Sequence, residues 1–95
     1  MGITRANRIV SFGKKVIHSD KYSEIGVSIG GRHVGVIFLS KGVEGWADCF
    51  GWRPESGQGE GLEPVEAKCF PLRNYETEEC GLKDAKRYVE TGLHS

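Results

Sequence analysis

The fold of this chain is decided by residues 24–40, which read EIGVSIGGRHVGVIFLS. Residues 25–29 alternate between apolar and small or polar side chains, and this two-residue period is typical of a half-buried β-strand. Gly30-Gly31 follows, and two glycines that accept positive φ suit a two-residue hairpin turn. Residues 32–40 are apolar on both faces, which is typical of a strand in the middle of a sheet. The stretch therefore predicts an antiparallel hairpin.

Further strands are expected on both sides of this hairpin. Residues 46–52 follow a glycine-containing turn and predict a third strand. Residues 65–72 predict a fourth strand, which ends or lies at an edge because its proline cannot donate to a ladder. On the N-terminal side, residues 9–12 and 15–18 are two short candidate strands separated by a glycine.

The end of the chain has the period of an amphipathic helix. Leu82, Ala85 and Val89 form an apolar stripe at helical spacing. Thr77 can cap this helix, and the two glutamates that follow it suit the first turn. A start at Leu82 is the alternative, because Gly81 costs up to about 1 kcal/mol relative to alanine inside a helix. The expected fold class is α+β, an antiparallel sheet of about four strands with one C-terminal amphipathic helix packed on one face.

The 95 residues are expected to form a single domain spanning residues 1–95. Residues 1–8 are expected to be loose, and residues 53–64 to form a flexible, glycine-rich acidic loop. No apolar run approaches the roughly 20 residues of a membrane span, so no membrane partner is expected. The first ten residues also lack the apolar centre of a signal peptide.

Cysteine and histidine usage predicts neither disulfides nor a metal site. Cys49, Cys69 and Cys80 are odd in number and unrelated in spacing, which favours a reducing compartment, and the expected location is the cytoplasm. No CxxC or HxxxH pair is present, although structural zinc sites use such close pairs. No cofactor is expected. No nucleophile–base constellation is evident either, so a catalytic role is not predicted.

Charge is unevenly distributed along the chain, although the net charge is zero. Residues 1–41 carry seven basic and two acidic side chains, whereas residues 42–79 carry three basic and nine acidic ones. Such polarity can steer association with a charged partner. The alternative is that folding mixes these charges over a solvated surface.

The faces of the predicted sheet follow from the register of the hairpin. Pairing Ile29 with Arg32 across the glycine turn places Val34 opposite Val27 and Val36 opposite Ile25. We expect this face, together with the small residues of the third strand, to meet the helix.

The opposite face then carries Trp46, Phe50 and Trp52, with Asp48 among them. One helix cannot cover both faces, so this aromatic face is either closed by the N-terminal segment or exposed as an interaction site. The acidic loop is a second candidate, as an anionic arm for a basic partner. The predicted partner-binding residues are Trp46, Asp48, Phe50, Trp52, Glu55, Glu60, Glu63 and Glu66.

The helix that starts GLKDAKR at residue 81 resembles the last helix of double-stranded-RNA-binding domains, which grips phosphates through a lysine-rich start. The resemblance covers about fifteen residues and implies Lys83, Lys86 and Arg87 as phosphate contacts. The chain departs from that family because residues 1–21 do not read as a helix. A solvated helix face, with Lys86 and Glu90 paired one turn apart, is the alternative interpretation.

The make-up of the whole chain resembles small proteins encoded by phages or mobile elements, including anti-CRISPR proteins. The shared features are a short stand-alone domain, a strand-rich middle, acidic stretches and one helix. The resemblance implies a non-enzymatic inhibitor that binds a host defence or nucleic-acid-handling complex in the host cytoplasm, with carboxylates in place of phosphates. The alternative is a nucleic-acid-binding module that uses the C-terminal helix and the basic N-terminus. A homodimer through the aromatic face is also possible.

Overall fold

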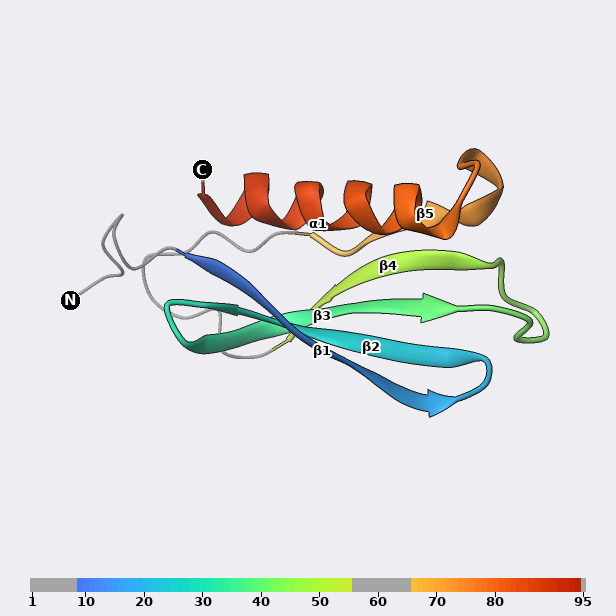
Figure 1. Cartoon of the computed structure of the whole chain (residues 1–95), viewed down its shortest axis with the longest axis horizontal. Helices are drawn as coiled ribbons and strands as arrows, with labels where there is room; N and C mark the ends of the chain where they lie inside the picture. The colour runs from blue at the N-terminus through green and yellow to red at the C-terminus, as the bar shows by residue number, and fades with distance from the viewer. Residues whose placement is uncertain (1–8, 56–65, 95) are drawn as a thin grey trace.

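The computed structural model describes residues 9–55 and 66–94 as a five-stranded antiparallel sheet and one C-terminal helix. The strands lie in sequence order, so each pairs with its neighbours along the chain (Figure 1). The α+β class is thus confirmed, with one strand more than expected. The elements are β1 (Val10–Ser19), β2 (Tyr22–Ile29), β3 (Arg32–Ser40), β4 (Cys49–Pro54), β5 (Lys68–Pro71), the short 3-10 helix η2 (Leu72–Asn74) and α1 (Glu78–His94).

Several boundaries differ from the sequence prediction. The strand expected over residues 65–72 is the shorter β5, Lys68–Pro71. The two candidate strands before residue 20 are one long strand, β1, which continues through Gly13 with an irregularity in its pairing. The third predicted strand starts later, at Cys49, because residues 46–48 belong to the loop before it. Arg53 and Pro54 belong to β4 and not to the acidic loop. Residues 1–8 and 56–65, where loose segments were expected, lie outside the described residues.

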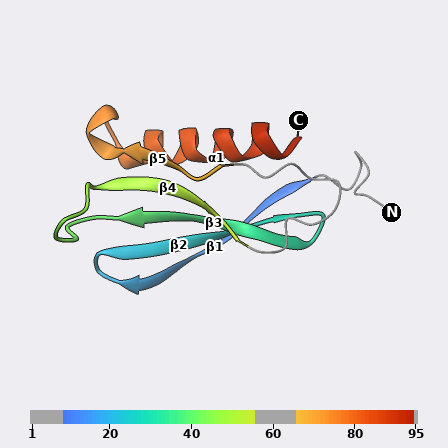
Figure 2. The ribbon, with the colours of Figure 1, turned by 180° about the vertical axis from the view of Figure 1, so that it is seen from behind.

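The helix α1 lies along one face of the sheet, over β4 and β5 (Figures 1 and 2). Among the described residues, no further layer covers the opposite face, which we call the open face. Burial of apolar side chains between α1 and the sheet supplies the main driving force for this arrangement. The core consists of Val27, Ile29, Val34, Ile37, Phe50, Trp52, Phe70, Ala85 and Val89.

A bulge in the central hairpin decides which face of β3 meets α1. Ile29 pairs with Arg32 as expected, but one extra residue in β3 then shifts the register, and Ile25 pairs with Ile37. The predicted pairings of Val27 with Val34 and of Ile25 with Val36 are therefore wrong, because Val27 pairs with Gly35. Because side chains alternate between faces, a single extra residue moves every later side chain of the strand to the other face. The covered face of β3 carries Ile37, and Val36 lies on the open face.

The helix begins at Glu78, as its capping residues predict. The backbone N–H of Cys80 donates to Thr77 Oγ1 at 3.3 Å, which satisfies one of the free donors at the helix start. The alternative start at Leu82 is wrong. Gly81 is buried, and a Cβ there would come within 3.1 Å of the Phe50 ring. Glycine is thus tolerated in this helix because it lets α1 approach the sheet closely.

Glycines on β3 and β4 also make room for two large rings. A Cβ at Gly35 would overlap the indole of Trp52 on the covered face. A Cβ at Gly51 would overlap the ring of Phe38 on the open face. Each ring therefore occupies the space beside a glycine of the neighbouring strand, where a larger residue would displace it.

We predict that Gly35→Ala lowers the free energy of unfolding by about 1–3 kcal/mol, because the new methyl group pushes Trp52 out of its position. Urea denaturation followed by circular dichroism measures the change. Gly13→Ala is the matched control, since a Cβ at Gly13 meets only one backbone atom at an ordinary distance. Equal losses in both variants would contradict the close approach of Trp52.

Candidate interaction surfaces

The three aromatic residues predicted to share a binding face lie in different surroundings. Phe50 and Trp52 are 5% and 1% exposed, because they lie on the face of β4 that α1 covers. Trp46 belongs to the loop between β3 and β4 and is 66% exposed. The expected aromatic sheet face is therefore not an accessible surface. It is closed by α1, and neither the N-terminal segment nor a partner is needed to cover it.

Tight turns hold Trp46 away from the body of the protein. Gly42 and Gly45 have φ values of 69° and 83°, a conformation that residues with a Cβ adopt at a cost. The backbone N–H of Gly42 donates to the Asp48 carboxylate at 2.9 Å, and the N–H of Trp46 donates to the Val43 carbonyl at 3.0 Å. Asp48, predicted as a partner contact, thus closes the loop that presents Trp46.

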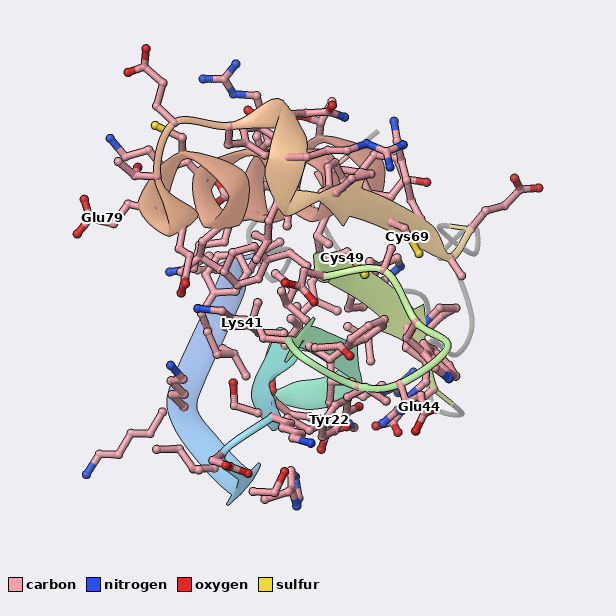
Figure 3. The ribbon with its side chains drawn as sticks, turned by 90° about the vertical axis from the view of Figure 1, so that its right-hand side faces the viewer. Tyr22, Lys41, Glu44, Cys49, Cys69 and Glu79 are labelled. Carbon is pink, nitrogen blue, oxygen red and sulfur yellow. The ribbon has the colours of Figure 1, made fainter. Side chains whose placement is uncertain are left out.

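Acidic side chains outnumber basic ones at the end of the molecule that carries this loop. The β1–β2 turn, the β3–β4 loop and the start of α1 all lie at this end (Figures 1 and 3). The N–H of Leu72 donates to the Asp48 carbonyl at 3.0 Å, and Lys41 forms an ion pair with Glu78. We call residues 19–22, 41–48 and 72–80 the acidic end. Its exposed carboxylates belong to Asp20, Glu44, Asp48, Glu76, Glu78 and Glu79, against the basic residues Lys21, Lys41 and Arg73.

The glutamates of the predicted acidic arm are only partly described. Glu55 is half-buried, and its carboxylate accepts from His33 Nε2 at 2.6 Å. The side chain of Glu66 is exposed, while its backbone carbonyl accepts from the Tyr88 hydroxyl at 2.8 Å. Glu60 and Glu63 lie outside the described residues. Of the four, Glu55 is therefore already engaged within the protein.

A charged network on the open face was missed by the sequence analysis. Glu24 accepts hydrogen bonds from Tyr22 at 2.8 Å, from Arg53 at 2.6 Å and from His18 Nε2 at 2.8 Å. Arg53 also lies 3.4 Å from Glu55, which links β2 to the end of β4. Only the register could have revealed this network, because β3 lies between the two strands that supply it. Its side chains cover part of the open face.

The pKa of Glu24 reflects this environment. Burial alone would raise the pKa of this carboxyl, but the hydrogen bonds from Tyr22, His18 and Arg53 outweigh burial and hold the pKa below its ordinary value. A carboxyl with a lowered pKa in the folded state stabilises the fold at neutral pH. That contribution is lost as the pH falls through the folded-state pKa.

We predict that Glu24→Gln flattens the acid limb of the stability–pH profile. The wild-type protein should lose stability as the pH falls below the pKa that Glu24 has in the unfolded chain, because protonation then favours unfolding. The variant lacks this titration and should lose less over the same range. Thermal unfolding between pH 7 and pH 3 measures the loss of stability, with Glu44→Gln as the exposed control. Parallel profiles for wild type and Glu24→Gln would show that the network does not stabilise ionised Glu24.

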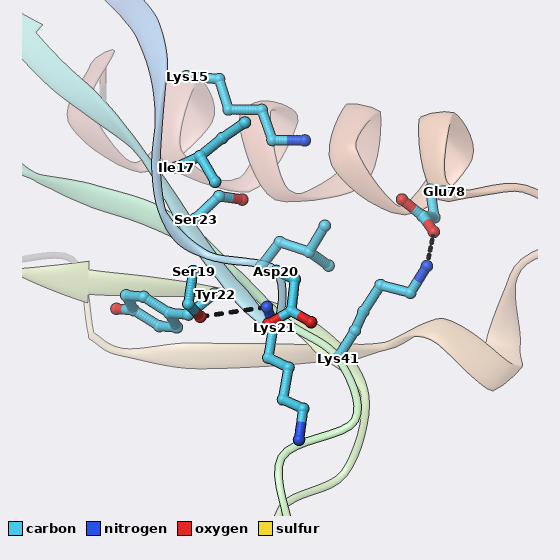
Figure 4. A pocket seen from close by; sticks show the side chains of 10 residues that line it. Lys15, Ile17, Ser19, Asp20, Lys21, Tyr22, Ser23, Lys41 and Glu78 are labelled. Atoms are coloured by element: carbon cyan, nitrogen blue, oxygen red, sulfur yellow. Dashed lines mark hydrogen bonds and ion pairs between the residues drawn. The ribbon is translucent and has the colours of Figure 1, made fainter.

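A hollow of about 240 Å³ lies between the β1–β2 hairpin and the start of α1 (Figure 4). Lys15 and Ile17 line it from β1, and the Lys41–Glu78 ion pair bounds it on the side of α1. A second hollow of about 160 Å³ shares Lys15 and continues towards Leu82 of α1. The uncovered part of the sheet beside α1 therefore combines apolar and lysine side chains.

The residues predicted as phosphate contacts lie within one turn of α1 but differ in exposure. Lys83 and Arg87 are exposed on α1, but Lys86 is half-buried, with its Nζ 5.0 Å from the centre of the Phe12 ring. Asp84 and Glu90 alternate with them along the helix. The helix surface is thus mixed in charge.

The three cysteines are free thiols. Cys49 is buried and lies beside Cys69 on the neighbouring strand (Figure 3). Burial, followed by the nearby Cys69 thiol, raises the pKa of Cys49. Within residues 9–55 and 66–94, no cluster of three or more histidine, cysteine or acidic side chains is placed to hold a metal ion.

Comparison with known proteins gives no relative: no family model, no curated protein and no solved structure matches this chain. In the part of the chain that the structure describes, no helix has the length and apolar character needed to cross a bilayer.

Proposed function

We propose that this protein is a non-enzymatic macromolecule-binding protein whose acidic end docks on a basic protein partner, with Trp46 as the anchor. The observation that carries the proposal is the position of Trp46. Two-thirds of this large side chain is exposed on a loop whose internal hydrogen bonds keep it there. Tryptophan is enriched among the residues that dominate binding energy at protein interfaces.

The charge of the acidic end supports a basic partner. Six exposed carboxylates outnumber three exposed basic side chains there, and the Lys41–Glu78 ion pair removes one from each set. The net negative field favours approach of a positively charged surface and disfavours nucleic acid, which carries phosphates. The anchor and the field thus select the same class of partner.

The finer proposal is an inhibitor of a host defence or nucleic-acid-handling complex, of the anti-CRISPR type and encoded by a phage or mobile element. Complexes that handle nucleic acid have basic grooves, and a group of carboxylates can occupy such a groove in place of phosphates. The generic resemblance of the chain to such inhibitors supports this reading. The alternative, nucleic-acid binding through Lys83, Lys86 and Arg87, has less support because Lys86 packs over Phe12.

We predict that Trp46→Ala abolishes capture of the partner without unfolding the protein. The wild-type chain should retain a basic protein or complex from a cytosolic extract of its host, identified by mass spectrometry. Loss of a central aromatic anchor costs about 2 kcal/mol or more, so retention should fall at least tenfold. Thr91→Ala, exposed near the other end of α1, is the control. Retention of the same proteins by Trp46→Ala would contradict the proposal, and salt-sensitive binding of duplex RNA would favour the alternative.

The charge of the acidic end is tested separately with Glu44→Gln, Glu76→Gln and Glu79→Gln combined. None of these carboxylates makes an ion pair among the described residues, so the fold should be unaffected. Association with the captured partner should slow and become less dependent on salt, because these rim charges act on the encounter rate. An unchanged rate measured by surface plasmon resonance would show that the field plays no part.

Fluorescence checks the geometry on which the proposal rests. Trp46 should be quenched readily by acrylamide, which is neutral and not repelled by the acidic end, whereas buried Trp52 should emit at shorter wavelength and resist quenching. Trp46→Phe should therefore leave only blue-shifted, quencher-resistant emission. Equal quenching of wild type and variant would place Trp46 in a protected site and remove the anchor.

A further inference from the structure

The edge strand β1 carries apolar side chains on both of its faces. Val16 and Ile17 are neighbours in sequence, so they point to opposite sides of the sheet, and they are 52% and 69% exposed. A strand with apolar residues on both faces is typical of the interior of a sheet, where it has neighbours on both sides. Within residues 9–55 and 66–94, β1 has a neighbouring strand on one side only, namely β2 (Figure 1).

The two edges of the sheet differ in how well they are protected. The edge strand β5 is four residues long, ends at Pro71 and lies near α1, so it offers few backbone groups. The edge strand β1 is ten residues long. Irregular pairing on either side of Lys15–Ile17 divides it, and these three residues form a regular stretch between the two irregularities. The accessible edge is therefore a short regular segment centred on the exposed apolar pair.

The charge beside this segment is positive. Lys14, Lys15 and Lys21 are exposed, and among the described residues none of them makes an ion pair. Pairing of β1 with β1 of a second copy would bring these lysines together, which is unfavourable across a sheet. An occupant with carboxylates at the matching positions would be attracted instead.

We propose that β1 binds a short, extended, acidic segment of a protein partner, which joins the sheet as a sixth strand beside Lys15–Ile17. Main-chain hydrogen bonds to the free edge would supply affinity, and alternate side chains would supply specificity, as in other cases of strand addition. Apolar side chains of the segment cover Val16 and Ile17. Its carboxylates pair with Lys14 and Lys15.

The surface beside α1 can receive one side of such a segment. Side chains on the covered face of the added strand would lie next to Ile17 and Lys15, which line the 240 Å³ hollow (Figure 4). This proposal goes beyond docking through Trp46, because it uses the edge of β1 and an occupant of the opposite charge, although the hollow itself borders the acidic end at Asp20 and Glu78. Either surface can therefore fail without the other.

The test uses the full chain, labelled with ¹⁵N, and a seven-residue peptide with three central valines flanked on each side by two glutamates, so that adjacent valines face both Val16 and Ile17. Amide shifts should move first at residues 15–17. A peptide of the same sequence with N-methyl groups on alternate backbone nitrogens keeps its charge but cannot complete the ladder. It should bind at least tenfold more weakly. Equal binding of both peptides would overturn strand addition, as would shifts confined to other residues or a concentration-dependent dimer paired through β1.

Charge reversal tests the chemistry of the occupant. The double variant Lys14→Glu, Lys15→Glu should lose at least tenfold in affinity for the glutamate peptide. It should gain affinity for the analogue with lysine in place of glutamate, and a misfolded protein would not show that gain. Lys83→Glu on α1 is the control for a general change of charge. If the lysine analogue binds the wild type as tightly as the glutamate peptide, the proposed preference for an acidic segment is wrong.

Discussion

The packing of Trp52 and Phe50 between the sheet and α1 is the interaction on which the rest of this structure depends. It requires space for the indole, which Gly35 provides, and a close approach of α1, which Gly81 allows. It also requires that β3 and β4 turn the right faces towards the helix, which the bulge in β3 ensures. With these rings covered, one helix is enough to shield the apolar face of the sheet. The open face is partly covered by its own charged network.

Local patterns in the sequence predicted the elements but not the faces. The alternation of residues 25–29, the glycine turn and the cap at Thr77 each act over a few residues, and each is confirmed. The bulge depends on how β3 fits against β2 and β4 at once, and no local pattern marks it. Because a single extra residue exchanges the faces, the sequence without the bulge predicts Phe50 and Trp52 on the surface, although they lie in the core.

The same argument explains which site residues could be predicted. Trp46 was predicted as a partner contact, but as the first residue of the third strand, whereas the structure places it in the loop before β4, where Gly42 and Gly45 form turns. Arg53 forms ion pairs with Glu24, which is 29 positions away in the sequence, and with Glu55, which is 2 positions away. The pair with Glu24 depends on the register of three strands. Charge counted along the chain therefore separated acidic from basic stretches correctly but could not tell which charges were already paired inside the protein.

Pairing decides which charges remain to attract another molecule. Arg53, Glu24 and Glu55 neutralise one another on the open face, and Lys41 is held by Glu78. What remains uncompensated is the excess of carboxylates at the acidic end, which also carries exposed Trp46, and the lysines of β1, which precede exposed Val16 and Ile17. Charge gives direction to an encounter, whereas apolar burial holds the complex together, so a surface with both is better suited to binding than a surface with either alone. A chain with no net charge can thus present two surfaces of opposite sign, each with its own kind of partner.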